Sequence, residues 1–84
     1  LADLNARTFS LLEELRPATR ARLLETLRSW LLHQGRREAV AQELFVHPQT
    51  VRYRMGQLRD LLGDRLDDPR WCEAAVVALA SRVA

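Results

Sequence analysis

The chain has 84 residues, 48% of them hydrophobic and 29% charged, which is ordinary for a folded globular domain and excludes a disordered chain. This length suits one domain over residues 1–84 with a modest core, and it excludes a core that also encloses a catalytic cavity. The formal net charge of +2 is mildly basic and does not by itself identify a nucleic-acid binder.

The first half of the chain predicts two helices with apolar residues at helical spacing. One is expected over residues 3 to 15, where Pro17 ends it. The next is expected from Thr19, whose hydroxyl can cap a helix by accepting a backbone N–H, to about His33. Gly35 suits the left-handed position beyond this helix. Its apolar stripe consists of Leu23, Leu27, Trp30 and Leu31.

The middle of the chain predicts two helices separated by a short corner. A short helix is expected over residues 37 to 44, a corner over residues 45 to 47, and a longer helix over residues 48 to 62. This longer helix opens with a proline, which suits a first helical position because the missing N–H would be unpaired there. His47 is then the N-cap, a poor residue type for it. Gly63 is the stop signal.

A fifth helix is expected from Asp68 as N-cap to about Arg82. Residues 74–80 are apolar on every side of this helix, and a domain this small cannot bury one of its helices all round. The excess predicts a homodimer through the fifth helix, or contact with a neighbouring domain. The predicted fold is therefore an all-α, five-helix domain containing a helix-turn-helix at residues 37 to 63.

The helix at 48 to 62 has two distinct faces when its residues are placed at 100° intervals. The buried stripe consists of Val51, Met55, Leu58 and Leu62. The opposite side carries Gln49, Arg52, Tyr53 and Gly56, with Thr50 and Gln57 on one flank. Gly56 either permits a close approach of a phosphate backbone or is merely tolerated, at a cost of about 0.5–1 kcal/mol relative to alanine.

The polar side chains of this helix suit duplex DNA. In a helix-turn-helix, the N-terminal part of the second helix approaches the base edges. Gln49 and Arg52 are therefore expected to contact bases, and His47 is also within reach. The side chains expected to contact phosphates are Thr50, Tyr53 and Arg54, and Gln57 lies on the same flank.

Two other interpretations of the same residues remain open. A polar helix face is often only solvated, in which case the domain is a helical protein–protein interaction or dimerisation module without DNA binding. Within the nucleic-acid binders, a sigma-factor-like promoter-reading domain that works with RNA polymerase is the second alternative. A test of whether the isolated domain binds DNA without RNA polymerase separates these interpretations.

No enzyme, metal site or cofactor is expected. His33, His47 and Cys72 lack the paired spacing of metal ligands. The Glu13–Glu14 pair points in two directions on a helix, so it does not form an acid–base pair. With no apolar run near 20 residues, no signal-peptide pattern and one cysteine, a cytoplasmic location without membrane contact is expected. A start at Leu1 predicts a fragment of a longer protein.

Three segments resemble one family of bacterial regulators. Residues 44–55 read Leu-Phe-Val-His-Pro-Gln-Thr-Val-Arg-Tyr-Arg-Met, residues 66–69 read Leu-Asp-Asp-Pro, and residues 23–31 read Leu-Leu-Glu-Thr-Leu-Arg-Ser-Trp-Leu. In order and spacing they resemble the C-terminal helix-turn-helix domain of PucR-type regulators, which include purine-catabolism and sugar-diacid regulators. The resemblance covers about residues 20 to 83.

This resemblance implies a sequence-specific DNA-binding domain of a bacterial transcriptional regulator, here the C-terminal fragment, with a ligand-sensing domain upstream. The pattern is also similar to the Fis-type helix-turn-helix, which implies a dimer. The residues that carry over as DNA-binding are His47, Gln49, Thr50, Arg52, Tyr53 and Arg54.

The chain departs from the family pattern at four places. Arg36 stands where asparagine often caps a helix, which weakens the cap and adds a candidate phosphate contact. The Pro48–Gln49 pair replaces a frequent Arg-Asn, so base preference does not carry over. The Gly56–Gln57 pair replaces a frequent basic pair, which lowers the expected non-specific affinity. Phe45 stands in the corner where glycine is common, so a wider turn is expected.

Overall fold

The computed structural model describes residues 12–83, and this part of the chain is helical, without a strand. It contains α2 (Pro17–Leu32), α3 (Arg37–Leu44), α4 (Pro48–Leu62), the 3₁₀ helix η1 (Gly63–Asp67) and α5 (Pro69–Val83). The helix predicted over residues 3–15 lies outside the described residues except for its end, where Leu12 and Glu13 are helical. Four α-helices are therefore found in the described part, and the predicted count of five is not confirmed.

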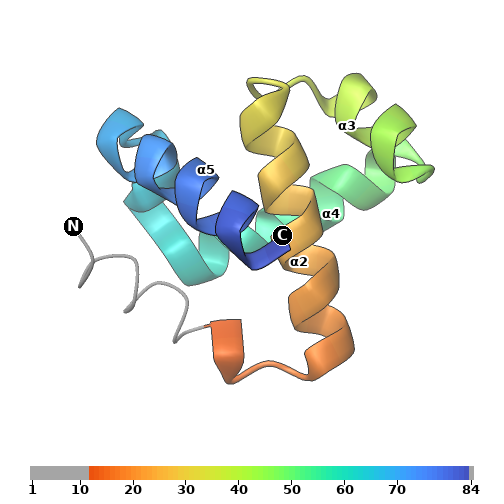
Figure 1. Ribbon diagram of the computed structural model, residues 1–84. Coiled ribbons are helices and arrows are strands. Elements are labelled where there is room, and N and C mark those ends of the chain that lie inside the picture. Colours follow the sequence, from red (N-terminus) through yellow and green to blue (C-terminus); the bar gives the residue numbers. More distant parts are fainter. Residues whose placement is uncertain (1–11, 84) are drawn as a thin grey trace.

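α2 is the central helix of the domain. It lies between α3 and α5, and α4 crosses it, so α2 packs against all three (Figure 1). Apolar side chains from every one of these helices meet in a single core. Its fully buried members are Leu12, Leu23, Leu27, Val40, Ala41, Val51, Met55, Leu58, Leu62, Trp71, Ala75 and Leu79. The buried stripe predicted for the fourth helix is thus confirmed in all four positions.

The bounds of α3 and α4 agree with the prediction, because local signals mark them. A proline occupies the first position of α4, where its fixed φ suits the helix and its missing N–H costs nothing. At the other end Gly63 has a φ of 57°, a conformation that side chains disfavour. The chain then continues directly into η1, which the sequence pattern did not predict.

The start of α2 corrects the prediction. Arg16 is the N-cap, with an extended backbone and no capping side chain, and Pro17 is the first helical residue. Thr19 was expected to be the cap but lies inside the helix. The physical reason is that proline begins a helix as readily as it ends the previous one, and here it does the former.

The end of α2 is a left-handed turn that uses two residues. Gln34 has a φ of 54° and Gly35 a φ of 79°, and the Gly35 N–H donates to Trp30 O at 2.9 Å. The glycine therefore stands one position later than expected. A Cβ at Gly35 would lie 3.3 Å from Trp30 Cζ2, so both the backbone and the neighbouring ring favour glycine here.

α5 begins as predicted, because the Arg70 N–H donates to Asp68 Oδ1 at 3.0 Å. The helix buries Trp71, Ala75 and Leu79 on one side. On the other side Val77 is 68% exposed. The apolar stretch of α5 thus divides between the core and the surface of the domain.

Candidate nucleic-acid interface

The corner between α3 and α4 consists of residues 45–47. Phe45 ends α3 with a left-handed backbone (φ 57°, ψ 43°), and the Val46 N–H donates to Ala41 O at 3.0 Å. Val46 is partly buried against the core. This is the hydrogen-bond pattern of a helix that ends in a left-handed residue, usually glycine. Phe45 adopts that conformation itself, so the corner keeps its three residues and the expected widening is not found.

His47 caps α4 effectively, which corrects the expectation of a poor cap. Its ring Nδ1 accepts the backbone N–H of Gln49 at 3.0 Å. A nitrogen that accepts a hydrogen bond carries no proton, so the neutral ring holds its proton on Nε2. The exposed His47 ring therefore fixes the start of α4 through one nitrogen and offers a donor through the other.

The outer face of α4 carries a shallow groove of about 480 Å³. Its lining residues are Gln49, Arg52, Tyr53, Gly56, Gln57 and Asp60. Gln49 and Arg52 are exposed, and Tyr53 is 69% exposed. A Cβ at Gly56 would meet nothing within 4 Å, so packing inside the domain does not require glycine there. The structure thus brings together four of the predicted site residues along one helix face, with an acid at its C-terminal end.

A second hollow of about 350 Å³ lies between α2 and α4. Its lining residues are Thr19, Arg22, Leu23, Thr50, Tyr53, Arg54 and Gln57. The three predicted phosphate contacts therefore gather on the flank of α4 that faces α2. Arg22 is a basic neighbour that the sequence reading missed, because it lies on another helix and no motif marks it.

Arg54 is half-buried and is tied to α2. Its Nη1 donates to Thr26 Oγ1 at 3.3 Å, and that buried hydroxyl donates to Arg22 O at 2.7 Å. A guanidinium group has five N–H donors, so one bond within the domain leaves others for a phosphate. Arg54 therefore holds α4 against α2 and lies beside the candidate phosphate-contacting flank.

Arg36 lies apart from the rest of the predicted site. It precedes α3 as an exposed residue in extended backbone and does not cap the helix with its side chain. Together with residues 37–39 and Gln42 it lines a separate hollow at the start of α3. Neither hollow on α4 includes Arg36, so a DNA contact there would be a second, peripheral one.

Glu43, the acid closest to the corner, is held against α2. Its Oε1 accepts the buried Ser29 hydroxyl at 2.5 Å and lies 3.2 Å from His33 Nε2. The Ser29 hydrogen bond, together with the neighbouring His33, holds the pKa of the Glu43 carboxyl below its usual range. Residues 44–59 contain no acid, so the corner and the first three turns of α4 carry no carboxylate.

In the part of the chain that the structure describes, the remaining reactive side chains form no second candidate site. No cluster of three or more possible metal ligands occurs among these residues. Burial, with Asp68 and Asp67 nearby, raises the pKa of the Cys72 thiol, which makes this cysteine less reactive than an exposed one. None of the helices in the described range combines the length and apolar character needed to cross a bilayer.

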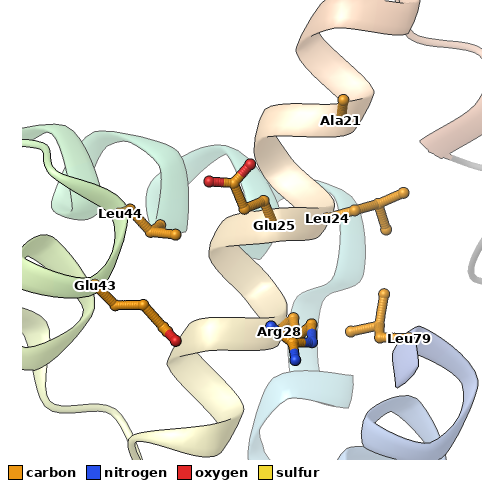
Figure 2. A pocket seen from close by; sticks show the side chains of 7 residues that line it. All are labelled: Ala21, Leu24, Glu25, Arg28, Glu43, Leu44 and Leu79. Atoms are coloured by element: carbon orange, nitrogen blue, oxygen red, sulfur yellow. The ribbon is translucent and has the colours of Figure 1, made fainter. Parts of the chain in front are cut away.

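A further hollow, of about 570 Å³, lies between α2, α3 and α5. Figure 2 shows its seven lining side chains: Ala21, Leu24, Glu25, Arg28, Glu43, Leu44 and Leu79. On α2 these residues centre about 130° around the helix from Arg22 and Thr26, which face α4. This hollow therefore lies on a different face of α2 from the candidate interface.

Comparison with known proteins gives one family. The model of the PucR C-terminal helix-turn-helix domain matches residues 23–81. Uncharacterized proteins of Mycobacterium tuberculosis and Mycobacterium bovis are each 44% identical over 61 residues, which is 73% of this chain and 14% of theirs. An uncharacterized protein from the pkwA 5′ region of Thermomonospora curvata is 40% identical over 52 residues, 62% of this chain and 29% of its own. No solved structure matches.

Proposed function

The chain belongs to the family of PucR C-terminal helix-turn-helix domains, and from this premise we propose that it is the sequence-specific DNA-binding domain of a bacterial transcriptional regulator, with α4 inserted in the major groove. The observation that carries this proposal is the exposed face of α4. The corner and the core hold the buried side of α4, and its exposed side presents Gln49 and Arg52 near the N-terminal end.

The proposed base contacts come from the first two turns of α4. Gln49 suits adenine and Arg52 suits guanine, because each can form two parallel hydrogen bonds with that base in the major groove. His47 adds a single donor, Nε2–H, since its Nδ1 is already used by the helix. A single donor can bond to the major-groove acceptors of guanine, adenine or thymine, so His47 would add little base discrimination.

The proposed phosphate contacts lie on the flank of α4 that faces α2. Thr50, Tyr53 and Arg54 line this flank together with Gln57, and Arg22 of α2 adds a basic group. Arg36 would reach the backbone separately, from the start of α3. Contacts of this kind fix the register of the protein on the duplex without carrying sequence information.

A homodimer fits the proposed role, because two recognition helices about 34 Å apart would read a pseudo-palindromic site. The exposed Val77 of α5 gives this proposal its candidate contact surface. The chain spans 14% of the length of its mycobacterial relatives. An upstream sensor domain and action in the cytoplasm are accordingly part of the proposal, and no catalytic role is assigned.

The alternative is an interaction module without DNA binding. The hollow between α2, α3 and α5 favours it, because leucines and charged side chains line a surface that α4 does not share (Figure 2). In that case another protein segment occupies the hollow and the polar face of α4 is only solvated.

A mobility-shift titration separates the two functions. The chain is titrated against duplexes selected from a random pool and against unrelated duplexes, at 50 and 200 mM salt, with sedimentation to establish whether a dimer has formed. We expect binding that prefers the selected duplexes and weakens steeply with salt, because each neutralised phosphate releases counterions. Absence of binding by the dimer at either salt concentration would refute the DNA-binding function and leave the interaction module.

A further inference from the structure

Phe45 combines a ring that the described part of the chain leaves almost fully exposed with the left-handed backbone that ends α3. Its side chain is 95% exposed, and its backbone has a φ of 57° and a ψ of 43°. An exposed phenyl ring forgoes the burial that stabilises other aromatic residues. A left-handed backbone is strained for any residue with a bulky side chain, whereas glycine adopts it freely.

The corner does not need this ring for its own structure. Val46, and not Phe45, packs against the core, and the closing hydrogen bond runs from the Val46 backbone to Ala41. Strain combined with exposure is characteristic of positions that act in an intermolecular contact. The exposed ring of Phe45 is therefore available to a partner outside the domain.

The position of Phe45 in the chain indicates the kind of partner. Phe45 is two residues from His47, whose ring caps α4, and four residues from Gln49. Chain geometry alone keeps its Cα within about 7 Å of His47 and about 14 Å of Gln49. The nearest acid, Glu43, is held against α2 by Ser29 and His33. An apolar ring beside the base-reading end of α4, without a repelling charge, suits DNA.

We propose that Phe45 contacts the C5 methyl group of a thymine at the edge of the site read by α4. Phenylalanine is one of the apolar side chains that recognise this methyl group in the major groove, and the contact distinguishes thymine from cytosine. The proposal rests on the proposed DNA-binding function and adds a specificity determinant outside the helix. A protein partner for the ring is the competing outcome.

Substitution at Phe45 separates a DNA contact from a structural role. Phe45→Gly removes the ring and the backbone strain together, so we expect a midpoint of thermal unfolding that is equal to or higher than that of the wild type. Affinity for the selected duplex should nevertheless fall several-fold. Leu32→Ala is the matched control, because it removes a half-exposed apolar side chain from α2 outside the interface, and its affinity should be unchanged.

Replacement of thymines by deoxyuridine, one position at a time, tests the methyl group itself. The wild type should lose roughly fourfold in affinity at one thymine of each half-site, as expected for one buried methyl group. Phe45→Gly should bind the thymine and deoxyuridine duplexes equally. The thymine contact would be overturned if Phe45→Gly lowered the affinity by the same factor for the thymine duplex and for every deoxyuridine duplex.

Failure of this inference is distinguishable from failure of the proposed function. If the wild type binds DNA and Phe45→Gly binds it equally well, the ring makes no contact that contributes to DNA binding, and only the inference is refuted. If the wild type binds no duplex, both proposals are refuted together.

Discussion

The guanidinium Nη1 of Arg54 donates to the buried hydroxyl of Thr26 at 3.3 Å, so the helix with the candidate DNA face is joined to α2 by a side chain from its own flank. Arg54 thereby takes part in both the packing of the domain and the proposed phosphate contact. The two roles respond differently to substitution at either end of the bond.

Thr26→Val keeps the shape of the buried side chain and removes its hydroxyl. We expect the free energy of unfolding to fall by about 1 kcal/mol, because the Arg54 guanidinium loses a buried acceptor. Affinity for all duplexes should fall uniformly and by less than in Arg54→Ala, since the charge of Arg54 remains. Urea denaturation and mobility shifts measure the two effects. A loss restricted to the selected duplex would contradict the assignment of Arg54 to phosphates.

Arg52→Ala and Arg54→Ala form a matched pair on one helix. Arg52 lines the outer groove of α4, and Arg54 lines the flank toward α2. Arg52→Ala should cost about 1–3 kcal/mol on the preferred duplex and relax discrimination between sites, whereas Arg54→Ala should weaken selected and unrelated duplexes alike. Competition titrations with both duplexes give the comparison. If Arg52→Ala and the wild type discriminate equally between selected and unrelated duplexes, Arg52 does not take part in base recognition.

Gly56→Ala should change stability and affinity in opposite directions. A Cβ at this exposed helical position meets nothing within 4 Å, so alanine should stabilise the domain by about 0.5–1 kcal/mol. Affinity should fall if the phosphate backbone approaches the helix at Gly56. Gly63→Ala is the control: its φ of 57° predicts destabilisation. A stabilised Gly56→Ala variant with unchanged affinity would show that the glycine is only tolerated.

Ser29→Ala should produce a destabilisation that depends on pH. The Ser29 hydrogen bond lowers the pKa of Glu43 from its usual 4.5, so this contribution is present above that pH and disappears as the pH falls through the lowered value. At pH 7 we expect a loss of about 1 kcal/mol in the free energy of unfolding. The difference from the wild type should shrink as the pH falls below 4.5.

Urea denaturation at neutral and acidic pH measures the Ser29→Ala effect. Thr19→Ala is the control, because it removes a hydroxyl from the same helix at a position that does not cap it. A Ser29→Ala effect of equal size at both pH values would mean that the serine stabilises α2 and α3 without the charge of Glu43.

The fold could be predicted from the sequence wherever residues close together in the chain determine it. Pro48 and Gly63 mark the two ends of α4, and the spacing of its apolar residues places one side in the core. The N-cap of α2 was wrongly predicted at Thr19 because that prediction also depended on local signals alone. Both Pro17 and Thr19 can start a helix, and no neighbouring residue decides between them.

The missed features depend on residues from different helices. Thr26 and Ser29 are buried hydroxyls whose partners, Arg54 and Glu43, lie on α4 and α3. No periodicity within α2 reveals these pairs. The proximity of Arg22 to the flank of α4 has the same origin, because it follows from the packing of two helices and not from a motif.

Both turns around α3 close through hydrogen bonds between residues five apart in the chain, Gly35 to Trp30 and Val46 to Ala41. Joining α2 to α3, and α3 to α4, therefore closes very short loops, which costs little chain entropy. Contacts between neighbours in sequence favour rapid folding, on the microsecond to millisecond scale for helical domains. We accordingly expect the helix-turn-helix to assemble early, before α5 completes the core with Trp71 and Leu79.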